Sequence, residues 1–180
     1  MTDTADAASI HVEGEGARLS VTIAATAADA LQLRYRLRNT GAGALAVFDR
    51  GNRHAVLGGR QAAGAAGAPT FEETADGTVI RHAALPAPAT PTGPTLPATP
   101  LARRLGSGDL LEEDISLRIP GSTPQRVRWC LGIAPFADDG SFRPDASHQD
   151  LWQADDAAVA RQRLLCTPWF ELATGRFASA

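Results

Sequence analysis

The densest group of reactive side chains lies in one short segment of the N-terminal third of the sequence. Five residues there place a carboxylate, two guanidinium groups, an amide and an imidazole within six positions: Asp49, Arg50, Asn52, Arg53 and His54. Such a set can bind a small anion or a partner's carboxylate, because arginine forks onto carboxylates. The alternative is a solvated loop in which Asp49 caps a turn. These five are the candidate binding residues, and none is predicted to be catalytic.

The remaining histidines and cysteines form no motif for metal binding or nucleophilic catalysis. The histidines stand far apart, and the cysteines are not in a CxxC pair: His11, His54, His82 and His148, with Cys130 and Cys166. A metal site would need ligands from distant segments. We therefore predict no metal, no cofactor and two reduced thiols. Because the chain has no lysine, Schiff-base and P-loop lysine chemistry is excluded.

Arginines recur on alternate positions of two predicted strands. Arg34, Arg36 and Arg38 share one strand face, and Arg126 and Arg128 share another. They could form a basic patch, or they could pair across strands with carboxylates such as Glu112 and Asp114, an arrangement worth little stability when exposed. The acidic segment 138–145 lacks the spacing of a calcium loop, so it is predicted to be a turn.

Prolines mark the most regular feature of the chain. They recur at every third position: Pro88, Pro91, Pro94, Pro97 and Pro100, preceded by Pro86. Polyproline II has three residues per turn, so this spacing predicts a stiff, extended connection over 86–104. A crossover between two sheets would use such a connection. The alternative is a ligand for the groove of a partner domain.

Composition limits the class of protein. The 180 residues suit a single domain over 1–180, with residues 1–8 flexible, and the net charge of −3 argues against a nucleic-acid partner. The alanine-rich, lysine-free composition is typical of a high-GC coding bias. The sequence has neither a signal peptide pattern nor a long apolar stretch, so we expect a cytoplasmic protein without a membrane partner.

The elements that must position these side chains read as strands. Residues 31–39 alternate apolar and polar side chains, as do 17–23, 112–119 and 126–133, and a shorter strand at 9–12 precedes them. A period of two is typical of a strand with one buried face.

Turn residues then predict how these strands pair. The turn 39–43 predicts a hairpin of 31–39 with 44–49, and Asp76-Gly77 predicts one of 70–73 with 78–82. Opposed strands would place Ile115 across from Trp129. The block 159–172 is predicted as one or two strands broken near Pro168, although 155–165 could instead be a helix.

The run from Leu33 to Gly41, followed by 45–49, resembles the paired strands of bacterial immunoglobulin-like sandwiches. A similar opening, and a turn-then-strand comparable to 105–119, occur in the intracellular proteinase-inhibitor family. The resemblance implies a fold, and no inhibitory residue carries over. The cysteine-tryptophan-cysteine spacing of antibody domains is absent.

The sequence thus predicts an all-β, immunoglobulin-like β-sandwich of about seven to nine antiparallel strands with a long proline-rich crossover. We expect a non-catalytic protein-binding module whose partner is another protein. The alternatives are a proteinase-inhibitor-like protein, or an enzyme with a site near 49–54. The sequence leaves the oligomeric state open.

Overall fold

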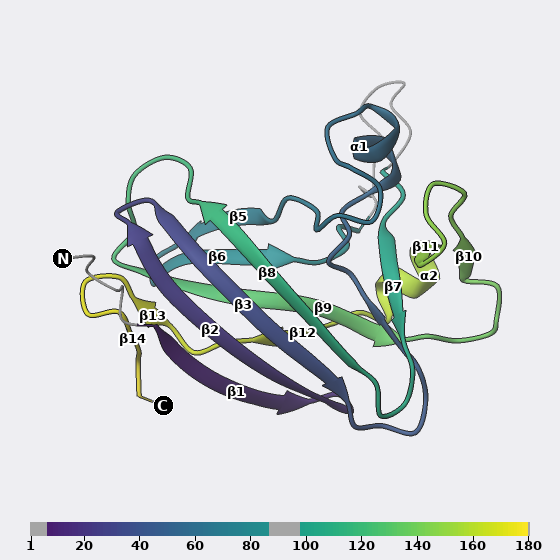
Figure 1. Cartoon of the computed structure of the whole chain (residues 1–180), viewed down its shortest axis with the longest axis horizontal. Coiled ribbons are helices and arrows are strands. Elements are labelled where there is room, and N and C mark those ends of the chain that lie inside the picture. Colours follow the sequence, from purple (N-terminus) through teal and green to yellow (C-terminus); the bar gives the residue numbers. More distant parts are fainter. Residues whose placement is uncertain (1–6, 87–97, 180) are drawn as a thin grey trace.

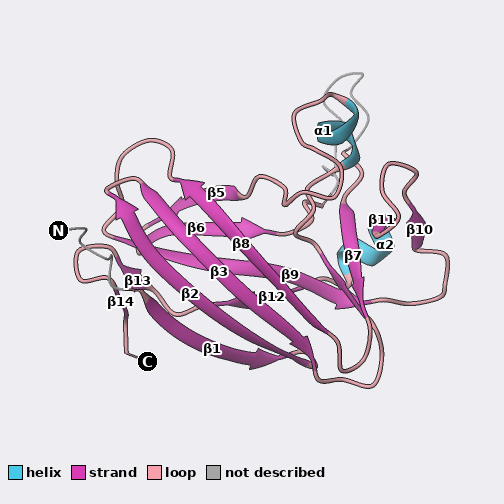
Figure 2. Cartoon of the chain, in the orientation of Figure 1, coloured by secondary structure: helices cyan, strands magenta, loops and turns pink. Residues whose placement is uncertain are grey.

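Two β-sheets face each other in the computed structural model, which describes residues 7–86 and 98–179 (Figure 1). Strands dominate these residues, and the two helices, α1 (Arg53–Leu57) and α2 (Asp156–Ala160), have five residues each (Figure 2). Neither described helix is long and apolar enough to span a membrane. The prediction of an all-β fold is confirmed.

The first sheet has four antiparallel strands in the order β1-β2-β3-β8. Their bounds are β1 Ala8–Gly14, β2 Ala17–Ala27, β3 Ala30–Asn39 and β8 Leu110–Arg118. The alternation seen in the sequence is the cause: Leu31, Leu33, Tyr35 and Leu37 are buried, whereas the arginines between them are exposed. Strands with one wet face build a sheet that covers the core on one side only.

The second sheet is built around β9 (Arg126–Pro135). One side of β9 pairs with β6 (Gly77–His82) and then β4 (Leu45–Val47); the other pairs with β13 (Phe170–Glu171) and β12 (Arg163–Cys166). The strands further out are β5 Thr70–Thr74, β7 Leu101–Leu105, β10 Phe142–Pro144, β11 Leu151–Ala154 and β14 Arg176–Phe177.

Apolar side chains pack on both faces of the second sheet. The larger cluster lies between the sheets and includes Trp129, Phe170 and the inward leucines of β3. The smaller one covers the opposite face, where Phe48 and Phe142 pack with several alanines and with Val159 of α2. Strand β9 is therefore buried on both faces over most of its length.

Two predicted strand pairings are wrong. Strand β4 does not form a hairpin with β3; it pairs with β7 and β9 in the other sheet. The run 45–48 is continuously buried, and such a strand needs a covered surface on both sides, which the solvated outer face of the first sheet cannot provide. Likewise Ile115 lies opposite Leu33, and Trp129 lies opposite Ile80, so the two predicted partners belong to different sheets.

Other local predictions are confirmed. Strands β5 and β6 form the expected hairpin, in which Thr74 pairs with Gly77, whose φ of +140° suits only glycine. The C-terminal block combines both readings, because α2 is followed by β12, and the chain breaks before β13 near Pro168.

The described residues contain eight strands of at least five residues and six shorter ones. Strand β6 runs parallel to β9, unlike the antiparallel arrangement expected throughout. Most of the proline repeat, from Pro88 to Pro97, lies outside the described residues. The last part of the predicted extended connection, from Leu101 onward, is instead strand β7. At the N-terminus, β1 begins at Ala8, which lies within the segment expected to be flexible.

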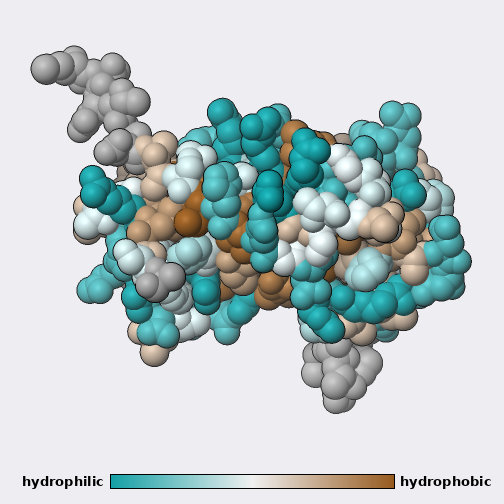
Figure 3. Space-filling model, turned by 90° about the horizontal axis from the view of Figure 1, so that it is seen from below, coloured by the Kyte–Doolittle hydropathy of each residue, from teal (hydrophilic) through white to brown (hydrophobic). Residues whose placement is uncertain are grey.

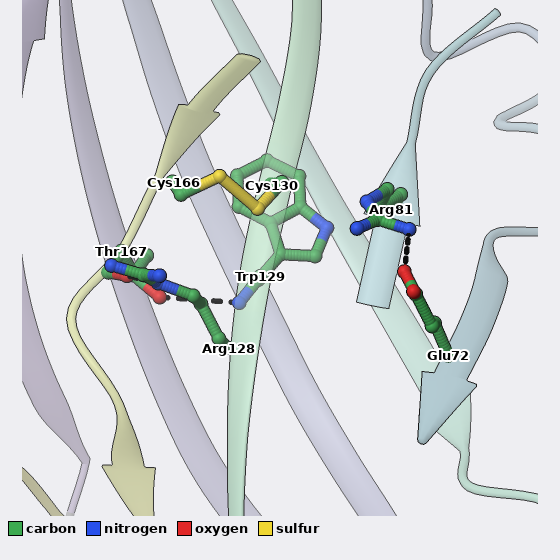
Figure 4. The surroundings of a disulfide bond; sticks show 7 residues. All are labelled: Glu72, Arg81, Arg128, Trp129, Cys130, Cys166 and Thr167. Carbon is green, nitrogen blue, oxygen red and sulfur yellow. Dashed lines mark hydrogen bonds and ion pairs between the residues drawn. A yellow bond between two sulfur atoms is a disulfide. The ribbon is translucent and has the colours of Figure 1, made fainter. Parts of the chain in front are cut away.

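Cys130 and Cys166 form a disulfide bond, so the prediction of two reduced thiols is wrong (Figure 4). The two residues lie directly opposite each other on β9 and β12. The Thr167 N–H donates to the Trp129 carbonyl at 2.9 Å, so the next pair, the cysteines, is a non-hydrogen-bonded one, where Cα atoms approach most closely. Their Cα atoms are 4.1 Å apart. The bond ties the segment after α2 to the central strand.

Removing this cross-link should lower the stability of the protein. We expect Cys130→Ala with Cys166→Ala to reduce the free energy of unfolding by about 2–4 kcal/mol, because the closed loop restricts the unfolded chain. Urea unfolding measures the change. Dithiothreitol should lower the stability of the wild type but not of the double variant, and titratable thiols in the unreduced native protein would contradict the assignment.

Candidate functional site

The structure divides the five candidate binding residues between the interior and the surface. Asp49 and Arg50 are buried. Asn52 caps α1, accepting the Ala55 N–H at 2.9 Å. Arg53 lies with its Nε 3.5 Å from a carboxylate oxygen of Asp145, and His54 is exposed on α1. The five side chains therefore do not share one surface, and most of them make contacts within the protein.

The two buried members belong to an ionic cluster between the sheets, which we call the Asp49 cluster: Tyr35, Asp49, Arg50, Arg103 and Glu113. The Asp49 side chain is 0% exposed and accepts from the Tyr35 hydroxyl and from Nε and Nη2 of Arg103, the Nε contact being 3.2 Å. Arg50 Nη2 donates to Glu113 at 2.5 Å, and Arg103 Nη2 lies 3.4 Å from the same carboxylate. Two cations thus balance two anions.

The electrostatics of the Asp49 cluster favour fixed protonation states. Burial, reinforced by the adjacent Asp49 charge, raises the pKa of Tyr35 well above its ordinary value, so the hydroxyl stays a donor. Burial alone would lower the pKa of Arg103, but the Asp49 carboxylate outweighs it and the pKa is raised. Groups whose protonation states are fixed in this way are better suited to stabilise the fold than to transfer protons.

A second buried polar contact joins His82 to Trp129. The Trp129 indole N–H donates to Nδ1 of His82 at 2.9 Å, and Nε2 lies 3.0 Å from the Gly67 carbonyl. Since indole can only donate, Nδ1 must accept and Nε2 carries the proton that it donates to Gly67. Burial, which outweighs the nearby Asp49 charge, lowers the pKa of His82. The imidazole is therefore a neutral bridge.

The other predicted clusters resolve into local contacts. Arg34 pairs with Asp114 at 2.6 Å and Arg36 pairs with Glu112, as the cross-strand alternative required. Arg126 and Arg128 lie over the ring of Trp169. Over residues 7–86 and 98–179, no group of three or more histidine, cysteine or acidic side chains is placed to hold a metal ion.

A groove of about 700 Å³ runs beside β8, on the side where the two sheets do not meet. Ile115, Ser116, Leu117 and Arg118 form one wall, and Phe71 of β5 with the loop 60–69 forms the other. In Figure 1, β8 is the edge of the front sheet nearest β5 and β6. The opposite side, in Figure 3, mixes polar and apolar side chains. The groove thus runs along a sheet edge, and its lining mixes apolar side chains with polar ones.

The backbone of β8 is open toward this groove. Hydrogen bonds from Ile119 N–H to Asp29 and from Asn39 N–H to Asp109 show that odd-numbered residues of β8 bond to β3. Antiparallel pairs alternate, so the even-numbered residues, including Ser116 and Arg118, direct N–H and C=O away from β3. In the part of the chain that the structure describes, β8 has no second partner strand. It offers an unpaired row of donors and acceptors.

The sequence analysis did not identify the Asp49 cluster or the groove beside β8. One signal for the Asp49 cluster was present: Glu113 occupies an inward position of a strand whose other inward residues are apolar, and a carboxylate there requires a buried partner. The groove had no such signal, because it depends on which strand ends the sheet. Comparisons of the chain with protein-family models, curated proteins and solved structures found no match.

The Asp49 cluster should contribute far more to stability than an exposed pair of the same chemistry. We expect Asp49→Ala to lower the free energy of unfolding by about 3–5 kcal/mol, because it leaves the largely buried guanidinium of Arg103 without its main partner. Asp114→Ala removes the exposed partner of Arg34 and should have a much smaller effect. Urea unfolding of both variants compares them, and equal losses would contradict the structural role of the Asp49 cluster.

His82 should make stability depend on pH. Its pKa is lower in the folded than in the unfolded protein, whose histidine has an ordinary value of 6.5. The unfolded state therefore binds the proton more readily, and the free energy of unfolding should fall as pH decreases below about 6.5. His82→Gln should reduce this dependence, while exposed His54→Gln should preserve it. Identical pH profiles for wild type and His82→Gln would refute the assignment.

Proposed function

We propose that the chain is a non-catalytic binding module that receives an extended segment of another protein along the open edge of β8. The observation that carries this proposal is the row of unpaired backbone groups at Ser116 and Arg118, which faces a groove lined in part by apolar side chains. An added strand gains affinity from main-chain hydrogen bonds, and pockets for alternate side chains supply specificity.

The burial of the titratable groups supports binding rather than catalysis near 49–54. An enzyme there would need Asp49 and His54 to converge on one pocket. Asp49 is instead held inside by Tyr35 and Arg103, while His54 projects from α1.

The immunoglobulin-like character of the sandwich belongs to the same proposal. Two facing sheets with a buried tryptophan, Trp129, between them support it. The disulfide lies within one sheet, between β9 and β12, and not across the sheets as in antibody domains. Disulfides persist mainly in oxidising environments, so we infer that this module works in such a compartment and not in a reducing cytoplasm.

Ser116→Pro tests the open edge. Proline removes the N–H that faces the groove and leaves the β3 ladder intact, so the free energy of unfolding should change less than in Leu117→Pro, which removes a ladder donor. Linear peptides selected on the wild type from a random displayed library should bind Ser116→Pro at least about tenfold more weakly.

Ser116→Ala is the matched control for this experiment. It keeps the backbone N–H and loses only the hydroxyl that donates to Gln32 at 2.7 Å on the outer face, so it should bind the selected peptides as the wild type does. Equal binding by the proline and alanine variants, or a library that yields no binding peptide, would show that the edge is not used.

A further inference from the structure

The lining of the β8 groove holds two arginines and no acidic side chain among the described residues. Arg60 and Arg118 are the only charged residues among the described residues that line it, and both are cations. Arg118 is neutralised by Asp29, whose carboxylate lies 2.6 Å from its Nη1. Within residues 7–86 and 98–179, no carboxylate lies within ion-pair distance of exposed Arg60.

Arg60 is the unpaired cation of the groove lining. Some arginines of this chain pair with carboxylates, as Arg34 does with Asp114, and others, such as Arg143, have no carboxylate within ion-pair distance among the described residues. What distinguishes Arg60 is its place, in the wall that faces the open edge of β8. Its guanidinium is also well suited to bind a carboxylate, because its planar fork can donate two parallel hydrogen bonds.

The β8 side of the groove favours apolar side chains beside the carboxylate of a bound segment. Side chains of a strand alternate between the two faces of a sheet. A segment paired with Ser116 and Arg118 would turn every second side chain inward, beside Ile115 and Leu117 of β8 and opposite Phe71. The loop between α1 and β5 is rich in alanine where it lines the groove, which leaves room for branched or aromatic side chains.

We propose that the segment received by the groove is acidic as well as apolar: an extended stretch in which inward apolar side chains are accompanied by an aspartate or glutamate that pairs with Arg60. This inference rests on the proposed function, since it names the chemistry of the partner for the same edge. Backbone pairing with β8 supplies the common affinity, and Arg60 selects among the sequences that can pair.

Selection from a library of random linear peptides, displayed on phage, tests the choice of partner. On the wild type, the recovered peptides should be enriched in aspartate or glutamate next to apolar residues. Arg60→Glu should instead recover peptides enriched in lysine or arginine, and should bind the wild-type acidic peptides about three- to fivefold more weakly. Arg143→Glu, which makes the same charge change at an exposed site on β10 outside the groove lining, should behave as the wild type.

The possible outcomes separate the two proposals. Peptides that show no acidic enrichment, yet lose binding in Ser116→Pro, would overturn the role of Arg60 and leave the open edge standing. Peptides that bind Ser116→Pro as well as Ser116→Ala would overturn both, as would an empty selection. A wild-type dimer in light scattering that becomes a monomer in Ser116→Pro would identify a second copy of the chain as the occupant, and would overturn the acidic-peptide inference.

Discussion

The structure depends on one buried carboxylate. Asp49 follows β4 and is held by a hydroxyl from β3 in one sheet and by the guanidinium of Arg103 from β7 in the other. Apolar packing between sheets is not directional and tolerates sliding, whereas these hydrogen bonds require a fixed relation between the strands that supply them. Removing a single partner leaves a charge in the interior, and the cost of that charge opposes arrangements that separate the partners.

The same cluster also contacts the strand at the open edge of the first sheet. Glu113 is an inward residue of edge strand β8, and its contacts with Arg50 and Arg103 hold that edge over the second sheet. No described strand continues the sheet beyond β8. Edge strands are usually protected from uncontrolled pairing by charged side chains, and β8 carries Glu112, Asp114 and Arg118 on its outer face. Its backbone nevertheless remains available beside the groove.

Local patterns could be predicted from the sequence where the cause was itself local. The alternation in 31–39 produced β3, and Asp76-Gly77 produced the β5–β6 hairpin, because side-chain period and turn chemistry involve only neighbouring residues. The pairing of distant strands could not be predicted where a turn could lead either to a neighbouring strand of the same sheet or across to the other sheet. The turn after Asn39 leads across to the second sheet, because residues 45–48 are continuously buried and need a covered surface on both sides.

The sequence by itself determined the strand content and the inward and outward faces of the strands, since both follow from residue type and a period of two. Only the tertiary structure decided that Asp49 and Arg50 turn inward, that Cys130 meets Cys166, and that β8 ends its sheet. Each of those outcomes joins segments far apart in the chain, so it depends on strand order and on the covering of both faces of β9. The spacing of residues along the sequence does not determine the strand order or which faces of β9 are covered.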